Sequence, residues 1–347
     1  MGMKQNMFDA LNRISADEKK EYTLQLPMNK DSKYTIFSDL HMQNGKLHED
    51  TFARNRNAFK AAIEYYQEKN YSIILLGDIE DFHQHTMLDI YSAYSDIYKL
   101  FQNFKPGKIY RIYGNHDIEW ALEDPISGRS QGIATEAIKL GDHIILTHGH
   151  QAQEFYEKDL QTVRFFTFIG KYYEKLFGSN SESSVTQYPS KKDEIYYDWA
   201  EENKKILICG HTHNPIFASQ PLVDLIPQRM NYLKTQLDIA KNSNNLIKIN
   251  TMYRRIKWLE GQKKLLEWQK KKNQETLGDV YRRDIKLDSN SPYYFNTGSG
   301  IFSDGITNIE IEGAKIRMTF WNREDNERDV ISNVMEKDMN SIIAGAV

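Results

Sequence analysis

Cysteine is almost absent from this chain: Cys209 is the single cysteine in 347 residues. One thiol cannot form an internal disulfide, which excludes the small secreted domains that rely on disulfides. No stretch reaches the roughly 18 apolar residues that a membrane-spanning helix needs. Residues 1–6 also lack the basic and then apolar pattern of a secretion signal. These absences predict a cytoplasmic protein.

An excess of charge of either sign is lacking as well. The formal net charge is -3, with 40% hydrophobic and 27% charged residues, as in ordinary globular proteins. The whole chain therefore has no general attraction to nucleic acids or acidic membranes, and only local patches could provide one. The length allows one large domain or two smaller ones.

Short apolar runs that end in Asp, Asn or His are what the chain has in abundance. The clearest is 206–215, where a strand-like run stops at Gly210 and is followed by His211 and His213. One such pair of histidines is weak evidence for a metal site, because histidines at strand ends are often solvated loop residues. The pattern recurs, however, where runs 34–37, 71–76, 108–113 and 143–146 lead into Asp39 and His41, Asp78, Asn115 and His148. We expect one site at one edge of one sheet.

The side chains in this pattern offer mixed oxygen and nitrogen ligands and no thiolate. The candidate metal ligands are Asp39, His41, Asp78, Asn115, His148, His211 and His213. Hard divalent cations take carboxylate and amide oxygens, and Mn²⁺, Fe²⁺ and Zn²⁺ also accept imidazole nitrogen. A single tetrahedral zinc would leave most of these groups unused. The set predicts two neighbouring divalent metal ions, Mn²⁺ in first place and Fe²⁺ or Zn²⁺ as alternatives.

Five ordered motifs carry a family resemblance over residues 34 to about 215. They are Asp39-x-His41, Gly77-Asp78-x-x-Asp81, Gly114-Asn115-His116-Asp117, His148-Gly149-His150 and Gly210-His211-x-His213. In this order they resemble the signature of the calcineurin-like metallophosphoesterases. The resemblance implies an α/β fold, a four-layer α/β/β/α metallophosphoesterase sandwich with a helical insertion. It also implies one metal on Asp39, His41, Asp78 and His213 and a second on Asp78, Asn115, His148 and His211, with Asp78 bridging.

The resemblance further implies hydrolysis of a phosphomonoester, phosphodiester or pyrophosphate bond. Two cations about 3.5–4 Å apart would grip a phosphoryl group and convert water to a metal-activated hydroxide. His116, oriented by Asp117, is the candidate proton donor to the leaving group, although it could instead only position its loop. Asp81 is expected to hold a ligand histidine rather than to bind metal. His150 is a weaker candidate than His148 for contact with metal or substrate. Surface or loop positions are expected for His48, His83, His85 and His143.

The same resemblance and the local patterns suggest a division of the chain. Residues 1–33 are expected to be an N-terminal lead-in, 34–215 and 291–322 the core, 216–290 an insertion and 323–347 a C-terminal tail. The apolar helix expected at 159–177 and the sequence 296–299 resemble a bacterial branch that includes UDP-2,3-diacylglucosamine hydrolases, where a helical lid covers the substrate. That helix could also simply pack between the core and a neighbouring element. Segments 307–311 and 315–321 predict a hairpin that closes the second sheet.

The insertion 216–290 has two apolar stripes, which predict an antiparallel pair of helices. The stripes are Met230, Leu233 and Leu237, then Met252, Ile256, Leu259 and Leu266. A basic face accompanies them: Arg254, Arg255, Lys257, Lys263, Lys264, Lys270, Lys271 and Lys272. Such a face is either a solvated helix surface or a contact for a phosphate-rich or membrane partner.

The expected partner is a phosphorylated small-molecule substrate. Nucleic acid binding through the basic insertion, peripheral membrane contact and a homo-oligomer formed through the helical segments are further expectations. Two other functions stay open: a nuclease or nucleotide phosphodiesterase of the same fold, or a non-catalytic metal-binding scaffold.

Overall fold

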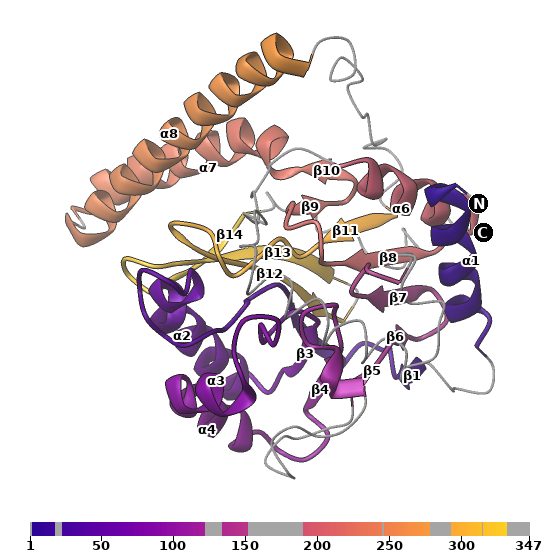
Figure 1. Ribbon diagram of the computed structural model, residues 1–347. Coiled ribbons are helices and arrows are strands. Elements are labelled where there is room, and N and C mark those ends of the chain that lie inside the picture. The colour runs from indigo at the N-terminus through magenta and orange to yellow at the C-terminus, as the bar shows by residue number, and fades with distance from the viewer. Residues whose placement is uncertain are drawn as a thin grey trace.

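Two β-sheets packed face to face form the centre of the molecule, with helices on both outer sides (Figure 1). The computed structural model describes residues 2–17, 23–121, 134–151, 190–244, 246–277, 293–313 and 315–331. Each sheet has seven strands. The expected helix at 159–177 lies outside the described residues.

Sheet I contains most of the strands from the first and last parts of the chain. Its order is β14 (Arg328–Val330), β13 (Lys315–Asn322), β12 (Gly305–Glu312), β2 (Lys33–Phe37), β3 (Ser72–Leu76), β4 (Ile109–Ile112) and β5 (Ala134–Thr135). Strands β2, β3, β4 and β5 run parallel, whereas β12, β13 and β14 are antiparallel to their neighbours.

Sheet II contains the remaining strands. Its order is β1 (Thr23–Leu26), β6 (Ala137–Leu140), β7 (Ile144–Thr147), β8 (Ile206–Cys209), β11 (Tyr294–Asn296), β9 (Ile216–Phe217) and β10 (Gln220–Pro221). Strands β7, β8 and β11 are parallel to one another. The predicted hairpin is β12–β13, but β12 pairs with β2. It therefore extends sheet I, which already holds β2 and β3, and does not close the second sheet as expected.

Helices cover the outer faces of both sheets. Sheet I is covered by η1 (Phe52–Asn55), α2 (Arg56–Glu68), α3 (Met87–Ala93) and α4 (Ser95–Gln102), and the short η2 (Ile118–Ala121) follows β4. Sheet II is covered by α1 (Met3–Ser15) and α6 (Lys191–Glu202). The helices α3 and α4 are separate because the backbone leaves the helical region at Tyr94.

The alternation of side chains along each strand produces the four layers. Ile73 and Leu75 of β3 pack against the helices over sheet I, while Ile74 and Leu76 pack between the two sheets. On β8, Leu207 faces α1 and α6, and its neighbour Ile208 faces sheet I. A strand buried on both faces reads as a continuous apolar run, which is why all these strands lack visible alternation. The predicted four-layer α/β/β/α fold is confirmed.

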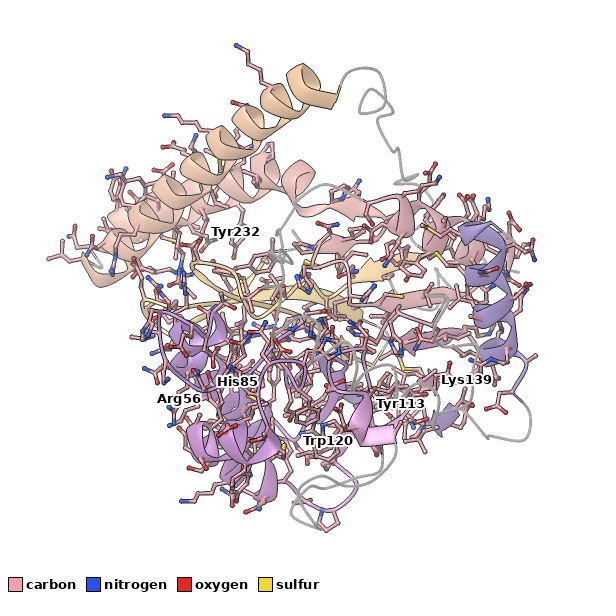
Figure 2. The ribbon with its side chains drawn as sticks, viewed as in Figure 1. Arg56, His85, Tyr113, Trp120, Lys139 and Tyr232 are labelled. Atoms are coloured by element: carbon pink, nitrogen blue, oxygen red, sulfur yellow. The ribbon has the colours of Figure 1, made fainter. Side chains whose placement is uncertain are left out.

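The two chain ends contribute more to the core than expected. Segment 1–33 was expected to be a lead-in, yet α1 packs on α6 and β1 pairs in parallel with β6. Lys139 of β6 lies beside α1 (Figure 2), where its Nζ donates to the carbonyl oxygen of Ser15 at 2.8 Å. Likewise β14, from the expected tail 323–347, pairs with β13. The strand β1 has just four residues, too few for a clear pattern in the sequence.

The segment 216–290 forms the predicted helical pair, but its first six residues belong to the core. Strands β9 and β10 join sheet II beside β11. The hairpin consists of α7 (Leu222–Asn242) and α8 (Leu246–Leu277), which project to one side of the sheets (Figure 1). Its internal apolar contacts include five residues of the predicted stripes, namely Leu233, Leu237, Met252, Ile256 and Leu259, together with Ile226, which the stripes did not include.

Candidate metal centre

The candidate ligands follow the carboxyl ends of strands in both sheets. Asp39, Asp78 and Asn115 follow β2, β3 and β4 of sheet I, whereas His148 and His211 follow β7 and β8 of sheet II. The expectation of one edge of one sheet was therefore wrong. The strands before these ligands are mainly buried apolar runs in both sheets, so the sequence offers no signal for which sheet each of them joins.

The backbone at these strand ends is unusual. Five candidate ligands have φ between 48° and 66°: Asp39, His41, Asp78, His211 and His213. This left-handed region costs a non-glycine residue about 1–2 kcal/mol, and such residues concentrate at functional sites. Backbone hydrogen bonds hold the turns: the Asp39 N–H donates to Gly77 O at 3.1 Å and the His41 N–H donates to Asp78 O at 3.0 Å.

A first cluster of ligand atoms is formed by Asp39, His41 and His213. The Nε2 atoms of the two histidines lie 3.1 Å apart, and Nε2 of His213 lies 3.2 Å from Oδ1 of Asp39. All three residues are buried. The Asp39 carboxylate is held in place by two hydrogen bonds, which its Oδ2 accepts from the Ser38 hydroxyl and from the His211 N–H.

A second cluster is formed by Asp78, His148 and His211. The Nδ1–H of His148 donates to Leu76 O at 2.8 Å, and its Nε2 lies 3.1 Å from Oδ2 of Asp78. Asp78 is held in turn by the His116 N–H, which donates to Oδ1 at 2.8 Å. The carboxylate also needs the glycine at 114, since a Cβ there would overlap it.

One buried atom of the set, Oδ1 of Asn115, lacks a hydrogen-bond partner among the described residues. Buried polar atoms are almost always paired, because an unpaired one costs about 1–3 kcal/mol. An amide oxygen and an imidazole nitrogen are both good ligands for divalent cations. The donor set therefore fits metal binding.

The electrostatics of the two clusters also favour cations. Burial lowers the pKa of His41 to about 4, and the nearby His116 adds to this effect, so the imidazole is neutral and able to donate a lone pair. Burial acts against protonation of His148 too, but the Asp78 and Asp39 carboxylates outweigh it and raise the pKa of His148 to about 9. The second cluster thus attracts a positive charge, which a metal ion would supply.

His116 lies beside the first cluster, its ring centroid 4.8 Å from that of His41. Its Nδ1 is 3.1 Å from Oδ1 of Asp81, and Oδ2 of Asp81 accepts from Nε2 of Gln43 at 2.9 Å. The expected orientation of His116 by Asp117 is therefore wrong, because Asp81 takes that position. Asp117 instead accepts from the backbone N–H groups of Ile79 at 2.8 Å and Gly114 at 2.6 Å.

Two residues near the site were missed in the sequence. The ring of His83, expected at the surface or in a loop, lies 4.2 Å from that of His116 between centroids. Nζ of Lys192 lies 2.8 Å from Nε2 of His211. The nearness of His83 to Asp81 in sequence was an available signal, whereas Lys192 is far from every motif. His48, by contrast, has a side chain that is 78% exposed, beside Glu49.

Buried polar contacts fix the loops that carry these ligands. Asp193 of α6 accepts hydrogen bonds from Thr212, Asn214 and Tyr294, and so holds the turn between His211 and His213. Glu80, two residues after Asp78, is held by several donors. They are Arg111 at 3.0 and 3.2 Å, Tyr98 OH at 2.8 Å and Nε1 of Trp120 at 3.0 Å (Figure 2).

A two-sheet sandwich with buried His and Asp clusters at its strand ends is the architecture of a metal-dependent phosphoesterase. The chain belongs to the calcineurin-like phosphoesterase family, whose model matches residues 32–215, more than half of its length. The family implies divalent metal ions. Comparison with curated proteins finds no match. None of the helices in the described part of the chain has both the length and the apolar character to cross a bilayer.

Proposed function

We propose that this chain is a dinuclear phosphoesterase that hydrolyses a phosphomonoester, phosphodiester or pyrophosphate bond. The observation that carries the proposal is the position of Asp78 between the two clusters. Its Oδ2 lies 3.1 Å from Nε2 of His148 in the second cluster and 3.9 Å from Nε2 of His41 in the first. One carboxylate that reaches both clusters is suited to hold two cations together.

The proposed ligands of one metal are Asp39, His41, Asp78 and His213, and those of the other are Asp78, Asn115, His148 and His211. Bound divalent cations would neutralise phosphoryl oxygens and make a nearby water more acidic. Mn²⁺ suits a set that mixes carboxylate, amide and imidazole, and Fe²⁺ or Zn²⁺ are the alternatives.

His116 is the proposed proton donor. Burial lowers the pKa of His116, but the Asp78 and Asp81 carboxylates outweigh burial and raise it to about 9. The imidazole is then protonated near neutral pH, and its side chain is 26% exposed, so a substrate can reach it. In hydrolysis the water oxygen bonds to phosphorus, the phosphorus–oxygen ester bond breaks, and His116 gives its proton to the departing oxygen.

A substrate screen tests this function. Purified protein is assayed with phosphomonoesters, bis-aryl diesters, nucleotides, UDP-sugars and single-stranded DNA, with added Mn²⁺ and with chelator. We expect hydrolysis of at least one class that depends on Mn²⁺ and stops with chelator. Stoichiometric metal binding without any hydrolysis would favour the non-catalytic scaffold instead.

A nuclease or nucleotide phosphodiesterase is the second candidate, supported by the surface of α8. Lys257, Lys263, Lys264 and Lys271 are exposed there and could follow a phosphate backbone. Against this, Glu267 lies 3.9 Å from Lys263, as on an ordinary solvated helix. The test measures binding of single-stranded DNA at increasing salt concentrations. Affinity that falls steeply with salt, and is lower in the double variant Lys263→Gln/Lys264→Gln, would support this candidate.

Finer assignments follow from the resemblance in the sequence. The UDP-2,3-diacylglucosamine hydrolase-like branch is supported by the sequence around Asn296, whose Nδ2 donates to Gly210 O at 2.8 Å beside the candidate ligands. Hydrolysis of UDP-sugars in the screen tests it. A cytoplasmic location, peripheral membrane contact and a homo-oligomer through the helical segments stay predictions.

A further inference from the structure

Lys192 is a cation placed directly against a candidate metal ligand. It lies in the first turn of α6, partly buried, with Nζ 2.8 Å from Nε2 of His211. Its neighbour Lys191 is exposed. The two lysines have the same charge and adjacent positions, but only Lys192 has its amine at the metal centre.

The position of Lys192 is fixed by the residue that follows it. Asp193 is fully buried and closes the first turn of α6 through a capping box with Ser190. The same carboxylate accepts from the Thr212 hydroxyl at 2.8 Å and from the Tyr294 hydroxyl at 2.7 Å. Asp193 therefore ties the start of α6 to the turn that carries His211, and Lys192 is held beside that histidine.

The electrostatic surroundings of Lys192 are unfavourable for an ammonium group. The positive end of the α6 dipole lies in the same turn. Two divalent cations held by only the Asp39 and Asp78 carboxylates would leave an excess of positive charge next to it. Each of these unfavourable interactions is relieved when an anion with more than one negative charge lies between the cations and the lysine.

We propose that Lys192 is a specificity-determining residue that binds a non-bridging oxygen of a terminal phosphoryl group with two negative charges. The inference rests on the proposed phosphoesterase function and narrows its substrate class. Phosphomonoesters and terminal phosphates of pyrophosphates carry this dianionic group, whereas a phosphodiester has one negative charge and gains less from the lysine. Lys192 therefore selects terminal phosphoryl groups over internal diesters.

Activity measurements compare Lys192→Met with the matched control Lys191→Met, and Lys192→Arg retains the charge. The substrates are p-nitrophenyl phosphate and bis-p-nitrophenyl phosphate, with Mn²⁺. A charge-assisted hydrogen bond suggests that Lys192→Met lowers kcat/KM for the monoester by about 10- to 100-fold. The diester should change by less than about 3-fold, the control should match wild type, and the arginine variant should recover part of the loss. Equal losses on both substrates would overturn the proposal.

A binding measurement separates this inference from the function on which it rests. Calorimetry gives the Kd of inorganic phosphate for the Mn²⁺-loaded variants, and elemental analysis gives their metal content. We expect Lys192→Met to weaken phosphate binding about tenfold or more with unchanged metal content. Unchanged phosphate affinity, or loss of metal that the arginine variant does not restore, refutes the role of Lys192. If phosphate binding is weakened but no form of the protein hydrolyses any substrate, the proposed phosphoesterase function is refuted, whereas the anion site at Lys192 is supported. If Lys192→Met does not fold, Lys192→Gln replaces it in both measurements.

Discussion

Residues of the same type have different contacts in this site, because their side chains point in different directions. Asp81 and Asp117 are both buried carboxylates near His116 in the fold, yet Asp81 contacts its imidazole while Asp117 holds backbone N–H groups. Burial and the negative charges of Asp78 and Glu80 raise the pKa of Asp117 to about 7. The Asp81 carboxylate is placed to orient the His116 imidazole, and the Asp117 carboxylate holds the turn that carries His116.

Asp78→Asn tests whether one carboxylate serves both metals. The substitution keeps the shape of the side chain and removes the shared negative charge, so both metals should be lost or weakened and activity should fall by at least about 100-fold. Elemental analysis of the purified protein measures this, with the exposed Asp142→Asn as control. Two metals retained at full occupancy in Asp78→Asn would show that the carboxylate does not bridge.

His116→Gln tests the assignment of the proton donor. Metal content should persist, while turnover should fall by about 10²- to 10⁴-fold, most for substrates with poor leaving groups, because these need the proton most. Asp81→Asn should produce a smaller change of the same kind, since it only orients His116. Rates for a series of aryl phosphates with different leaving-group pKa values measure the effect. A loss that is the same for all leaving groups, or one accompanied by loss of metal, would show His116 to be structural.

Among the elements, the α7–α8 hairpin combines its own apolar contacts with an ionic attachment to sheet I. Arg255 of α8 is buried and contacts three carboxylates near β14: Asp325 at 3.4 Å, Glu327 at 3.0 Å and Asp329 at 3.1 Å. Since the apolar cluster lies between the two helices, the hairpin can retain its helices when this attachment is weakened.

Arg255→Met should loosen the hairpin without unfolding the sandwich. The removal of a buried guanidinium leaves carboxylates without a partner, but these are partly solvated, so we expect a cost of about 1–2 kcal/mol. Hydrogen exchange should become faster in α7, α8 and β14, and stay unchanged in β3. Lys263→Met, at an exposed position on the same helix, is the control, because its ion pair with Glu267 stays within α8. Unaltered exchange in the hairpin would mean that other contacts hold it.

At the scale of the whole molecule, the proposed metals connect the two sheets. Asp39, Asp78 and Asn115 belong to turns after sheet I strands, while His148, His211 and His213 belong to turns after sheet II strands. Two buried carboxylates and several imidazoles from the two sheets meet at this junction, so bound cations would be shared between the sheets.

Metal loading should therefore stabilise the whole sandwich. At a free Mn²⁺ concentration 100 times the Kd, each site would add about 2.7 kcal/mol, which raises Tm by several degrees. Differential scanning calorimetry of wild type with Mn²⁺ and with chelator measures the shift, and Asp78→Asn should lack it. A Tm that changes with neither Mn²⁺ nor chelator would show that cations do not join the sheets at this site.

The sequence by itself determined the longer apolar strands, the order of the motifs, the candidate ligands and a helical pair within 216–290, because these depend on local runs and periodicity. Only the tertiary structure decided that the ligands come from two sheets, that Asp81 contacts His116, and that Lys192 and His83 lie at the site. It also decided that β1, β9, β10 and β14 belong to the sheets, since strands of two to four residues are stabilised by their neighbours. The physical reason is the same throughout: which residues meet depends on how distant segments pack, and packing leaves no local pattern in the chain.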